Sequence, residues 1–266
     1  MAEADAIAAA PVERPLLARA RRGAGARVAS VVVFVLAWGL VAALAHSRVL
    51  PGPLAVAARL AEFARNGQIF VDTGITLARV AVSFVIAMLV GSAIGIVLGR
   101  RRGLDHFFDS WLVIALNVPA LVTIILCYVW FGLSEVAAIL AVAINKIPLV
   151  AVQLREGARA IDPDLMAMAE AFAVPRGRRF RRVFLPQLFP YLMAAARSGL
   201  ALIWKIVLVV ELLGRPDGVG FRLGEYFQYF DIAAVLAYTL VFVVLVLGIE
   251  MAIFRPLERR LSGWRQ

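Results

Sequence analysis

The sequence predicts an all-α membrane protein with about six transmembrane helices. Of its 266 residues, 62% are hydrophobic and 17% are charged, which is too apolar for a soluble domain of this length. A hydrocarbon core of about 30 Å needs about 20 apolar residues per helix. The apolar runs are continuous, whereas the strands of a β-barrel alternate over about ten residues. They lie near residues 28–46, 78–99, 107–131, 135–153, 192–213 and 232–254.

The formal net charge of +10 is explained by membrane topology rather than by a nucleic-acid partner. Arginines gather before the first run, at residues 100–102, across residues 155–182 and from residue 255 onward. If the N-terminus is cytoplasmic, all these segments face the cytoplasm. Cytoplasmic loops carry an excess of Lys and Arg, so we expect both termini to be cytoplasmic.

The chain divides into three parts. Residues 1–27 are rich in alanine and arginine, and we expect a disordered cytoplasmic leader that is retained rather than cleaved. Residues 28–254 form the transmembrane domain, with a cytoplasmic loop at about 155–190, and residues 255–266 form a cytoplasmic tail. Helical spacing of apolar and charged residues over 54–63 predicts a short interfacial helix on the outer side.

Two features predict how the spans pack and bend. Gly91, Gly95 and Gly99 recur every four residues, which lets another helix approach closely. Packing within one subunit is favoured here over a contact between two copies. Asn117 and Pro119 interrupt the third span, and a proline removes a backbone hydrogen bond, so we expect a kink beside protein or a wet cavity.

Lys205 and Glu211 are charged residues within the fifth apolar run. A charge at the centre of a span costs about 2.5–3.5 kcal/mol. Residues six apart do not share one face of a straight helix, so we expect each to find a partner on another helix, in a cavity or at an interface. The alternative is a purely structural role, as a buried ion pair or a snorkelling lysine.

The residues needed for most catalytic or metal sites are missing. The lysines Lys146 and Lys205 do not follow a glycine, which excludes a phosphate-binding loop. His46 and His106 have no second ligand four residues further on, and Cys127 is the one cysteine, which disfavours a zinc protease or a disulfide framework. We therefore expect a chain without catalytic activity, metal or bound cofactor.

The arginine-rich insert between the fourth and fifth runs contains two short helical patterns. Leu165, Met168 and Phe172 follow helical spacing, with Glu170 on the polar side, and the segment 173–175, Ala-Val-Pro, then bends the chain. In the second piece apolar and basic residues form opposite edges. The apolar edge comprises Phe180, Val183 and Phe184, and the basic edge Arg178, Arg179, Arg181 and Arg182.

Such an insert fits two kinds of partner equally well. It can form a knob that enters a groove of a soluble protein, or it can lie on anionic lipid. Composition alone does not choose between them.

The order of helix, bend, basic stretch and Leu185-Pro186 resembles the cytoplasmic loop of permease subunits of binding-protein-dependent ABC importers. In that family the loop reads Glu-Ala-Ala, three residues, Gly and, further on, Leu-Pro. Counting back from Leu185, the family's glutamate falls on Ala167, its alanines on Met168 and Ala169, and its glycine on Ala173. The nearby segment 170–172, Glu-Ala-Phe, is out of register.

Further motifs resemble the nitrate, sulfonate, taurine and bicarbonate branch of these permeases, and the resemblance covers the chain from about residue 30 onward. They are Leu50-Pro51-Gly52-Pro53, the segment from Trp130 to Ser134, Ile161-Asp162-Pro163-Asp164, Trp204 with Glu211-Leu212-Leu213, and Gly218-Val219-Gly220.

The resemblance implies a type I ABC importer permease fold in the bacterial inner membrane. It implies a pore made with a second copy of the chain, an ABC ATPase partner that binds ATP and Mg, and a periplasmic binding protein that delivers a small solute. A sulfonate, taurine, nitrate or a related anion is favoured, and membrane lipid surrounds the complex. An ion-coupled secondary transporter is the alternative, and it would use Lys205 and Glu211.

We predict two groups of functional residues, from this resemblance and from the cost of charges within the membrane. The ATPase-coupling group is Asp164, Leu165, Ala167, Met168, Glu170, Phe172, Ala173, Pro175, Phe180 and Arg181. The translocation-path group is Asn117, Thr123, Trp204, Lys205 and Glu211.

Overall fold

The computed structural model describes residues 14–47, 49–254 and 256, and within these ranges all regular structure is helical. Four helices are long and apolar enough to cross a membrane. These are α3 (Gln68–Arg100), α6 (Glu135–Arg159), the helix formed by α8 (Arg176–Arg179), η1 (Phe180–Phe184) and α9 (Leu185–Gly214), and α11 (Ile232–Ile249) with the start of η2 (Glu250–Phe254). The prediction of an all-α membrane protein is confirmed.

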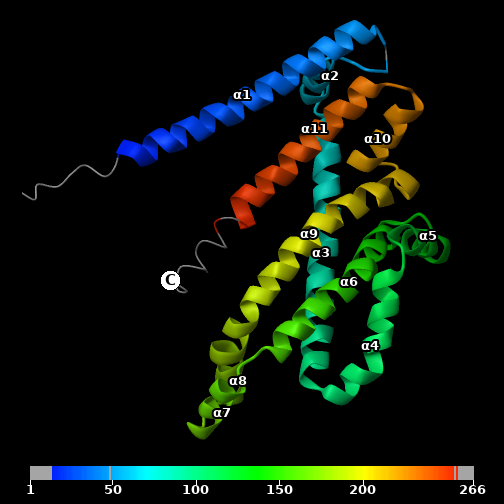
Figure 1. Ribbon diagram of the computed structural model, residues 1–266. Coiled ribbons are helices and arrows are strands. Elements are labelled where there is room, and N and C mark those ends of the chain that lie inside the picture. Colours follow the sequence, from blue (N-terminus) through cyan, green and yellow to red (C-terminus); the bar gives the residue numbers. More distant parts are fainter. Residues whose placement is uncertain (1–13, 48, 255, 257–266) are drawn as a thin grey trace, which may run out of the picture.

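Two further segments match the remaining apolar runs. The pair α4 (Arg102–Asn117) and α5 (Ala120–Phe131) qualifies as one span but is bent by 93°. The apolar part of α1 (Arg14–Ala45) covers residues 29–45. Figure 1 shows α1 running away from the other helices, with α2 lying beneath its end.

Short helices lie at both ends of the bundle (Figure 1). At one end, here called the α10 end, are α2 (Pro53–Arg65) and α10 (Val219–Gln228), and the turn between α5 and α6 lies there too. At the other, the α7 end, α7 (Pro163–Ala171) and α8 project beyond the ends of α3 and α6. The helix α2 confirms the predicted helix over 54–63.

The helices α3 and α6 pack closely against each other through the predicted glycines. A Cβ atom on Gly91 would lie 2.7 Å from Val150 Cβ, and one on Gly99 would lie 2.6 Å from the Arg155 carbonyl oxygen. Gly95 faces the Ala151 carbonyl in the same way. These glycines therefore serve packing within one copy of the chain, as predicted.

The break at Asn117 and Pro119 is stronger than a kink. The helix α4 ends at Asn117, Val118 is extended, and α5 restarts after Pro119. Proline has no N–H to donate and disfavours helical geometry in the residue before it. The third span is consequently two helices at nearly a right angle.

Three helix boundaries differ from the sequence predictions. The helix α3 begins at Gln68 rather than 78, because its first turns carry polar residues that are buried against other helices. The helix through η1 and α9 is continuous past Leu185-Pro186, and the π-helical turn η1 directly precedes this proline. The helix α1 includes residues 14–27, where a disordered leader is predicted, because Ala, Leu and Arg favour helix. Residues 1–13 and most of the predicted tail, 255 and 257–266, lie outside the described chain.

The glycine packing yields a stability prediction. We expect Gly99→Ala to lower the free energy of unfolding by about 1–3 kcal/mol, because its Cβ would overlap the backbone of α6. Gly74→Ala on the same helix is the control. A Cβ at Gly74 meets nothing within 4 Å, so that variant should gain up to about 1 kcal/mol from helix propensity. Equal stability of the two variants, measured by SDS titration in mixed micelles, would contradict the packing role.

Candidate functional site

A buried ion network occupies the α10 end, and Arg79 of α3 is at its centre. The Arg79 side chain is 4% exposed. Its Nη1 donates to Glu211 Oε1 of α9 at 2.8 Å, and its Nε donates to Glu135 Oε1 of α6 at 2.6 Å. It also pairs with Asp217 in the turn between α9 and α10. One guanidinium therefore connects three other parts of the chain.

Glu211 is fully buried, and both of its carboxylate oxygens have partners. Besides Arg79, the Gly220 N–H of α10 donates to Oε2 at 2.8 Å, and Thr76 Oγ1 donates to it at 3.0 Å. The Val219 N–H in turn donates to Thr76 Oγ1 at 2.9 Å. Since α10 begins at Val219, its start is fixed to α3 and α9 by these bonds.

A second cluster continues the network along α3. Asp72 Oδ2 accepts from Tyr238 of α11 at 2.8 Å and from Arg222 Nε of α10 at 3.1 Å. Burial by itself lowers the pKa of the Arg222 side chain. The hydrogen bond to Glu225 and the charge of Asp72 raise this pKa by more than burial lowers it, so the net shift is upward. The helices α6, α9, α10 and α11 are thus each attached to α3 at this end.

The sequence analysis did not find this site, because Arg79 was placed at the edge of a span. Asp72, Thr76, Arg79 and Ser83 are all buried on one face of α3. Their spacing of four, three and four residues is that of a single helix face. These polar residues lie on the same helix face as Gly91 and the other glycines. This pattern in the sequence could have indicated that they are buried.

The predicted path residues separate into buried and exposed groups. Glu211 lies inside the ion network, Trp204 packs edge-on against Phe242 with centroids 5.7 Å apart, and Thr123 is buried. Asn117 is exposed at the helix break, and Lys205 is exposed on α9. Within the described chain Lys205 makes no hydrogen bond or ion pair. Glu211 has the partner predicted for it on another helix.

At the α7 end, the loop helix α7 has a well-formed start. The Asp162 carboxylate accepts from the N–H groups of Asp164 and Leu165 at 2.8 and 3.3 Å, and Pro163 occupies the first turn. Asp and a following Pro are preferred at these positions. The Asp162 N–H also donates to Gln187 Oε1 at 2.9 Å, which ties α7 to α9.

The geometry at the end of α7 explains why the family has a glycine at the position of Ala173. The Val174 N–H donates to the Ala169 carbonyl at 3.0 Å, and the Ala173 N–H donates to the Glu170 carbonyl at 2.9 Å. This is a Schellman motif, which places a left-handed residue just after the helix. Ala173 is that residue, with φ of 51°, and it is where the family has glycine. An alanine is tolerated there at a cost of about 1 kcal/mol.

The helix α7 has two different faces. Leu165, Met168 and Phe172 are exposed on one side, to 41, 53 and 78%. Met166, Ala167 and Glu170, on the opposite side by helical spacing, line a cavity between α7 and the ends of the spans. The apolar face is therefore free, while Ala167, at the position of the family's glutamate, borders the cavity and is exposed.

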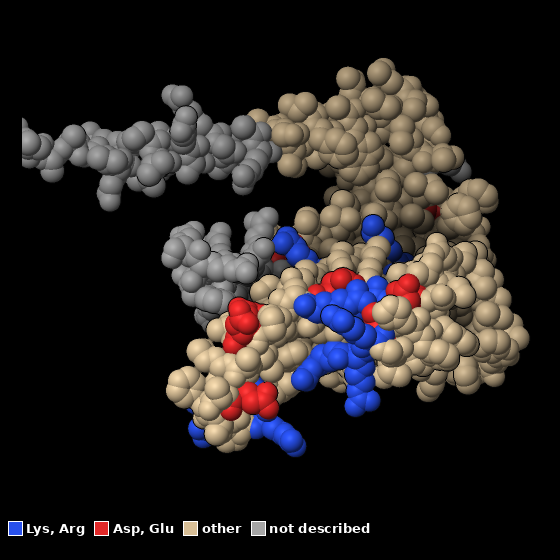
Figure 2. Space-filling model, turned by 60° about the horizontal axis from the view of Figure 1, so that its bottom comes forward, with Lys and Arg blue, Asp and Glu red and all other residues tan. Residues whose placement is uncertain are grey.

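The second loop piece is held to the first and to α3. Arg179 pairs with Glu170 at 3.1 Å, and the rings of Phe180 and Phe184 stack at 5.3 Å. Phe184 is buried, with the Arg100 guanidinium 5.2 Å from its ring centroid. The other predicted coupling residues, Asp164, Pro175 and Arg181, are exposed. Figure 2 shows basic side chains at this tip and over the neighbouring span ends.

The model of one protein family, described as the inner membrane component of binding-protein-dependent transport systems, matches residues 87–263. The chain belongs to this family. The predicted recognition as an ABC importer permease is confirmed, and the match includes the loop, α6, α9 and α11.

Two curated relatives and one solved structure illustrate the similarity. The permease is 28% identical over 88% of its length to the putative aliphatic sulfonates transport permease protein SsuC of Bacillus subtilis, of which 85% is covered. It is 25% identical over 89% of its length to the taurine transport system permease protein TauC of Escherichia coli, of which 88% is covered. An inward-facing structure of the MetNI methionine ABC transporter has a TM-score of 0.60 at 20% identity, covering 70% of this chain and 92% of that one.

These similarities confirm the predicted branch and fold. The permease is a multi-pass inner membrane transport protein, and its helical architecture is that of the solved ABC permeases.

The ion network predicts a large loss of stability on removal of its centre. We expect Arg79→Met to lower the free energy of unfolding by about 3–5 kcal/mol, because Glu211 would remain buried without its charged partner. Arg59→Gln is the control, since Arg59 is half-exposed and pairs with Glu62 and Asp231 outside this network, and exposed pairs contribute about 0–1 kcal/mol. SDS titration of both variants measures the difference. A similarly small effect at Arg79 would mean that the network does not hold the α10 end together.

Proposed function

We propose that the permease is the pore subunit of an ATP-driven importer, and that the exposed face of α7 is where a separate ABC ATPase docks. The face of Leu165, Met168 and Phe172 is the observation that carries this proposal. A projecting helix with a free apolar side fits a hydrophobic groove on a soluble partner. The family and the named relatives support the same assignment.

The position of α7 would allow it to transmit a movement of the ATPase to the membrane helices. Its start is bonded to Gln187 of α9, and Glu170 is paired with Arg179 on the helix that continues into α9. A displacement of α7 by the ATPase would therefore act on α9. Rigid movement of packed helices between two states is a common form of switching, and here it would alternate the pore between inward-facing and outward-facing forms.

Lys205 supports a pore that includes a second copy of the chain. It lies on the exposed face of α9 with Leu202 and Val209, and a lysine in mid-span facing lipid would cost about 2.5–3.5 kcal/mol. Contact with a second copy and with a water-filled path removes that cost. Both Lys205 and Asn117 would then line the path, while Trp204, Thr123 and Glu211 support it from within.

The cargo is proposed to be a small organic or inorganic anion delivered by a periplasmic binding protein. Relatives are named for aliphatic sulfonates, taurine and bicarbonate, and all of these carry an anionic group. Lys205 provides a single positive charge at the proposed path, which suits such a group. With the predicted orientation, the binding protein would meet the α10 end and the ATPase the α7 end.

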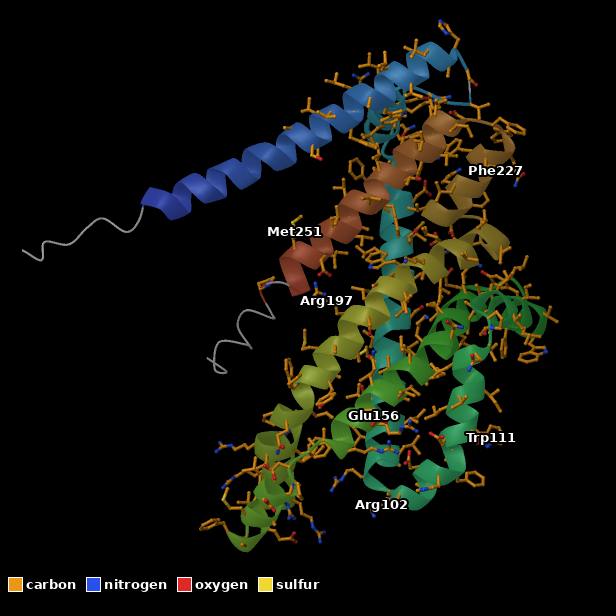
Figure 3. All side chains as sticks on the ribbon, in the orientation of Figure 1. Arg102, Trp111, Glu156, Arg197, Phe227 and Met251 are labelled. Carbon is orange, nitrogen blue, oxygen red and sulfur yellow. The ribbon has the colours of Figure 1, made fainter. Side chains whose placement is uncertain are left out.

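The docking proposal predicts loss of the ATPase from one variant. We expect Phe172→Asp to abolish copurification of the ATPase, because the charge would enter an apolar interface. Phe227→Asp is the matched control, since Phe227 is exposed to a similar extent but lies at the α10 end (Figure 3). Normal ATPase binding and ATP-driven uptake by Phe172→Asp in proteoliposomes would refute the proposal.

The cargo proposal predicts which compounds activate the complex. In proteoliposomes containing permease, ATPase and binding protein, we expect an alkyl sulfonate, taurine or bicarbonate to stimulate ATP hydrolysis and a neutral amide of similar size not to do so. Lys205→Met should reduce uptake without loss of ATPase binding, whereas Leu202→Met on the same face should not. Stimulation by neutral solutes alone would exclude an anionic cargo.

A further inference from the structure

A cavity of about 630 Å³ lies behind α7, between the loop and the ends of the membrane spans. Its floor is apolar, with Met166, Ile161, Phe180 and Phe184 among the lining residues. This size and composition are typical of ligand sites, which combine apolar walls with a few polar groups. The cavity uses the inner face of α7, so it is distinct from the proposed ATPase-docking face.

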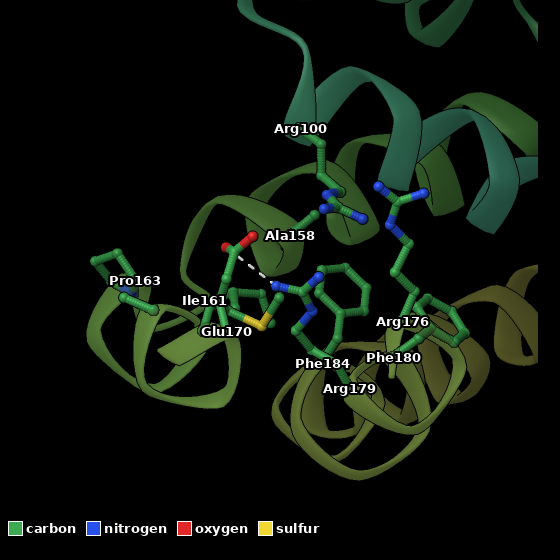
Figure 4. A pocket seen from close by; sticks show the side chains of 11 residues that line it. Arg100, Ala158, Ile161, Pro163, Glu170, Arg176, Arg179, Phe180 and Phe184 are labelled. Atoms are coloured by element: carbon green, nitrogen blue, oxygen red, sulfur yellow. Dashed lines mark ion pairs between the residues drawn. The ribbon is translucent and has the colours of Figure 1, made fainter. Parts of the chain in front are cut away.

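Three arginines line this cavity and only one carboxylate opposes them. Arg100 comes from the end of α3, and Arg176 and Arg179 come from α8. Glu170 pairs with Arg179, and the Arg100 guanidinium lies over the ring of Phe184. Within the described residues neither Arg100 nor Arg176 makes an ion pair or a hydrogen bond through its side chain. In Figure 4 the guanidinium groups of Arg100 and Arg176 point into the same space. The cavity thus has an excess of positive charge.

The cavity lies at the level where the membrane spans end. Arg100 is the last residue of one candidate span, Ala158 is next to the last residue of another, and Arg176 is the first residue of a third. The 33 residues of α3 give a helix of about 50 Å. This is close to the thickness of about 40–45 Å that a bilayer has with its headgroups, so the end of α3 reaches the headgroup layer.

We propose that this cavity binds the headgroup phosphate of an anionic phospholipid. Arginine pairs with phosphate through two parallel hydrogen bonds, and basic pockets between transmembrane helices bind acidic headgroups. Arg100 and Arg176 hold the phosphate, and the apolar floor accommodates the glycerol and the adjoining chain. The proposal concerns binding by the permease alone and does not depend on the ATPase or on the cargo.

The test measures lipid binding by the purified full-length permease in detergent, using native mass spectrometry. The probes are phosphatidylglycerol, phosphatidylcholine and, as a soluble phosphate, glycerol 3-phosphate. The variants are Arg100→Gln with Arg176→Gln, and a control pair, Arg178→Gln with Arg182→Gln. The control removes the same charge from a separate groove of the same loop, which is lined by Gly177, Arg178, Arg181 and Arg182.

We expect tight binding of phosphatidylglycerol by the wild type and a loss of about tenfold or more in the cavity variant, since each basic residue contributes substantially at a charged lipid surface. The control pair should change binding by less than about twofold if the cavity is specific. Arg176→Gln alone should also weaken binding, and it removes no intramolecular ion pair or hydrogen bond, so it tests the site without disturbing the fold.

Two results would overturn the proposal. Equal losses in the cavity variant and the control pair would show general attraction of lipid to a basic loop. Binding of glycerol 3-phosphate as tight as that of phosphatidylglycerol would show that the cavity takes a soluble phosphate instead of a lipid.

Discussion

The buried charge of Arg79 is the constraint on which the α10 end depends. A guanidinium enclosed by α3, α6 and α9 is stable only when its donors meet acceptors, because an unpaired buried charge costs several kcal/mol. Glu135, Glu211 and Asp217 supply those acceptors from three separate parts of the chain. None of these elements can shift relative to α3 without breaking a charged hydrogen bond, so this end of the bundle behaves as one unit.

The α7 end is built differently. Within the described chain, the side-chain bonds that hold α7 are the hydrogen bond from the Asp162 N–H to Gln187 of α9 and the ion pair between Glu170 and Arg179. The long helices α3, α6 and α9 run from this end to the ion network. Close packing between Gly91, Gly99 and α6 prevents α3 and α6 from sliding. A force applied at α7 would thus be carried along rigid helices toward the α10 end.

Several features could be read from particular residues. The period of Gly91, Gly95 and Gly99 identified a close helix contact, and Asn117 with Pro119 identified a break, because both depend on local backbone chemistry. The two pieces of the loop were likewise visible, the first from Leu165, Met168 and Phe172 and the second from Phe180, Val183 and Phe184. The ion network was not, because Arg79, Glu135, Glu211 and Asp217 are brought together only by folding. Counting apolar runs also placed the start of α3 too late, since the run near 78–99 leaves Asp72 outside the span and Arg79 at its edge.

The sequence by itself determined the all-helical membrane class, the family and the loop, since these follow from apolar run length, charge distribution and local motifs. Only the tertiary structure decided which charges meet, which side of α7 stays free and which side closes a basic cavity. It also showed why Ala173 stands where the family has glycine, because its left-handed φ is set by the helix end. The physical reason is that desolvation and pairing of charges depend on neighbours distant in the chain, which helical periodicity alone does not reveal.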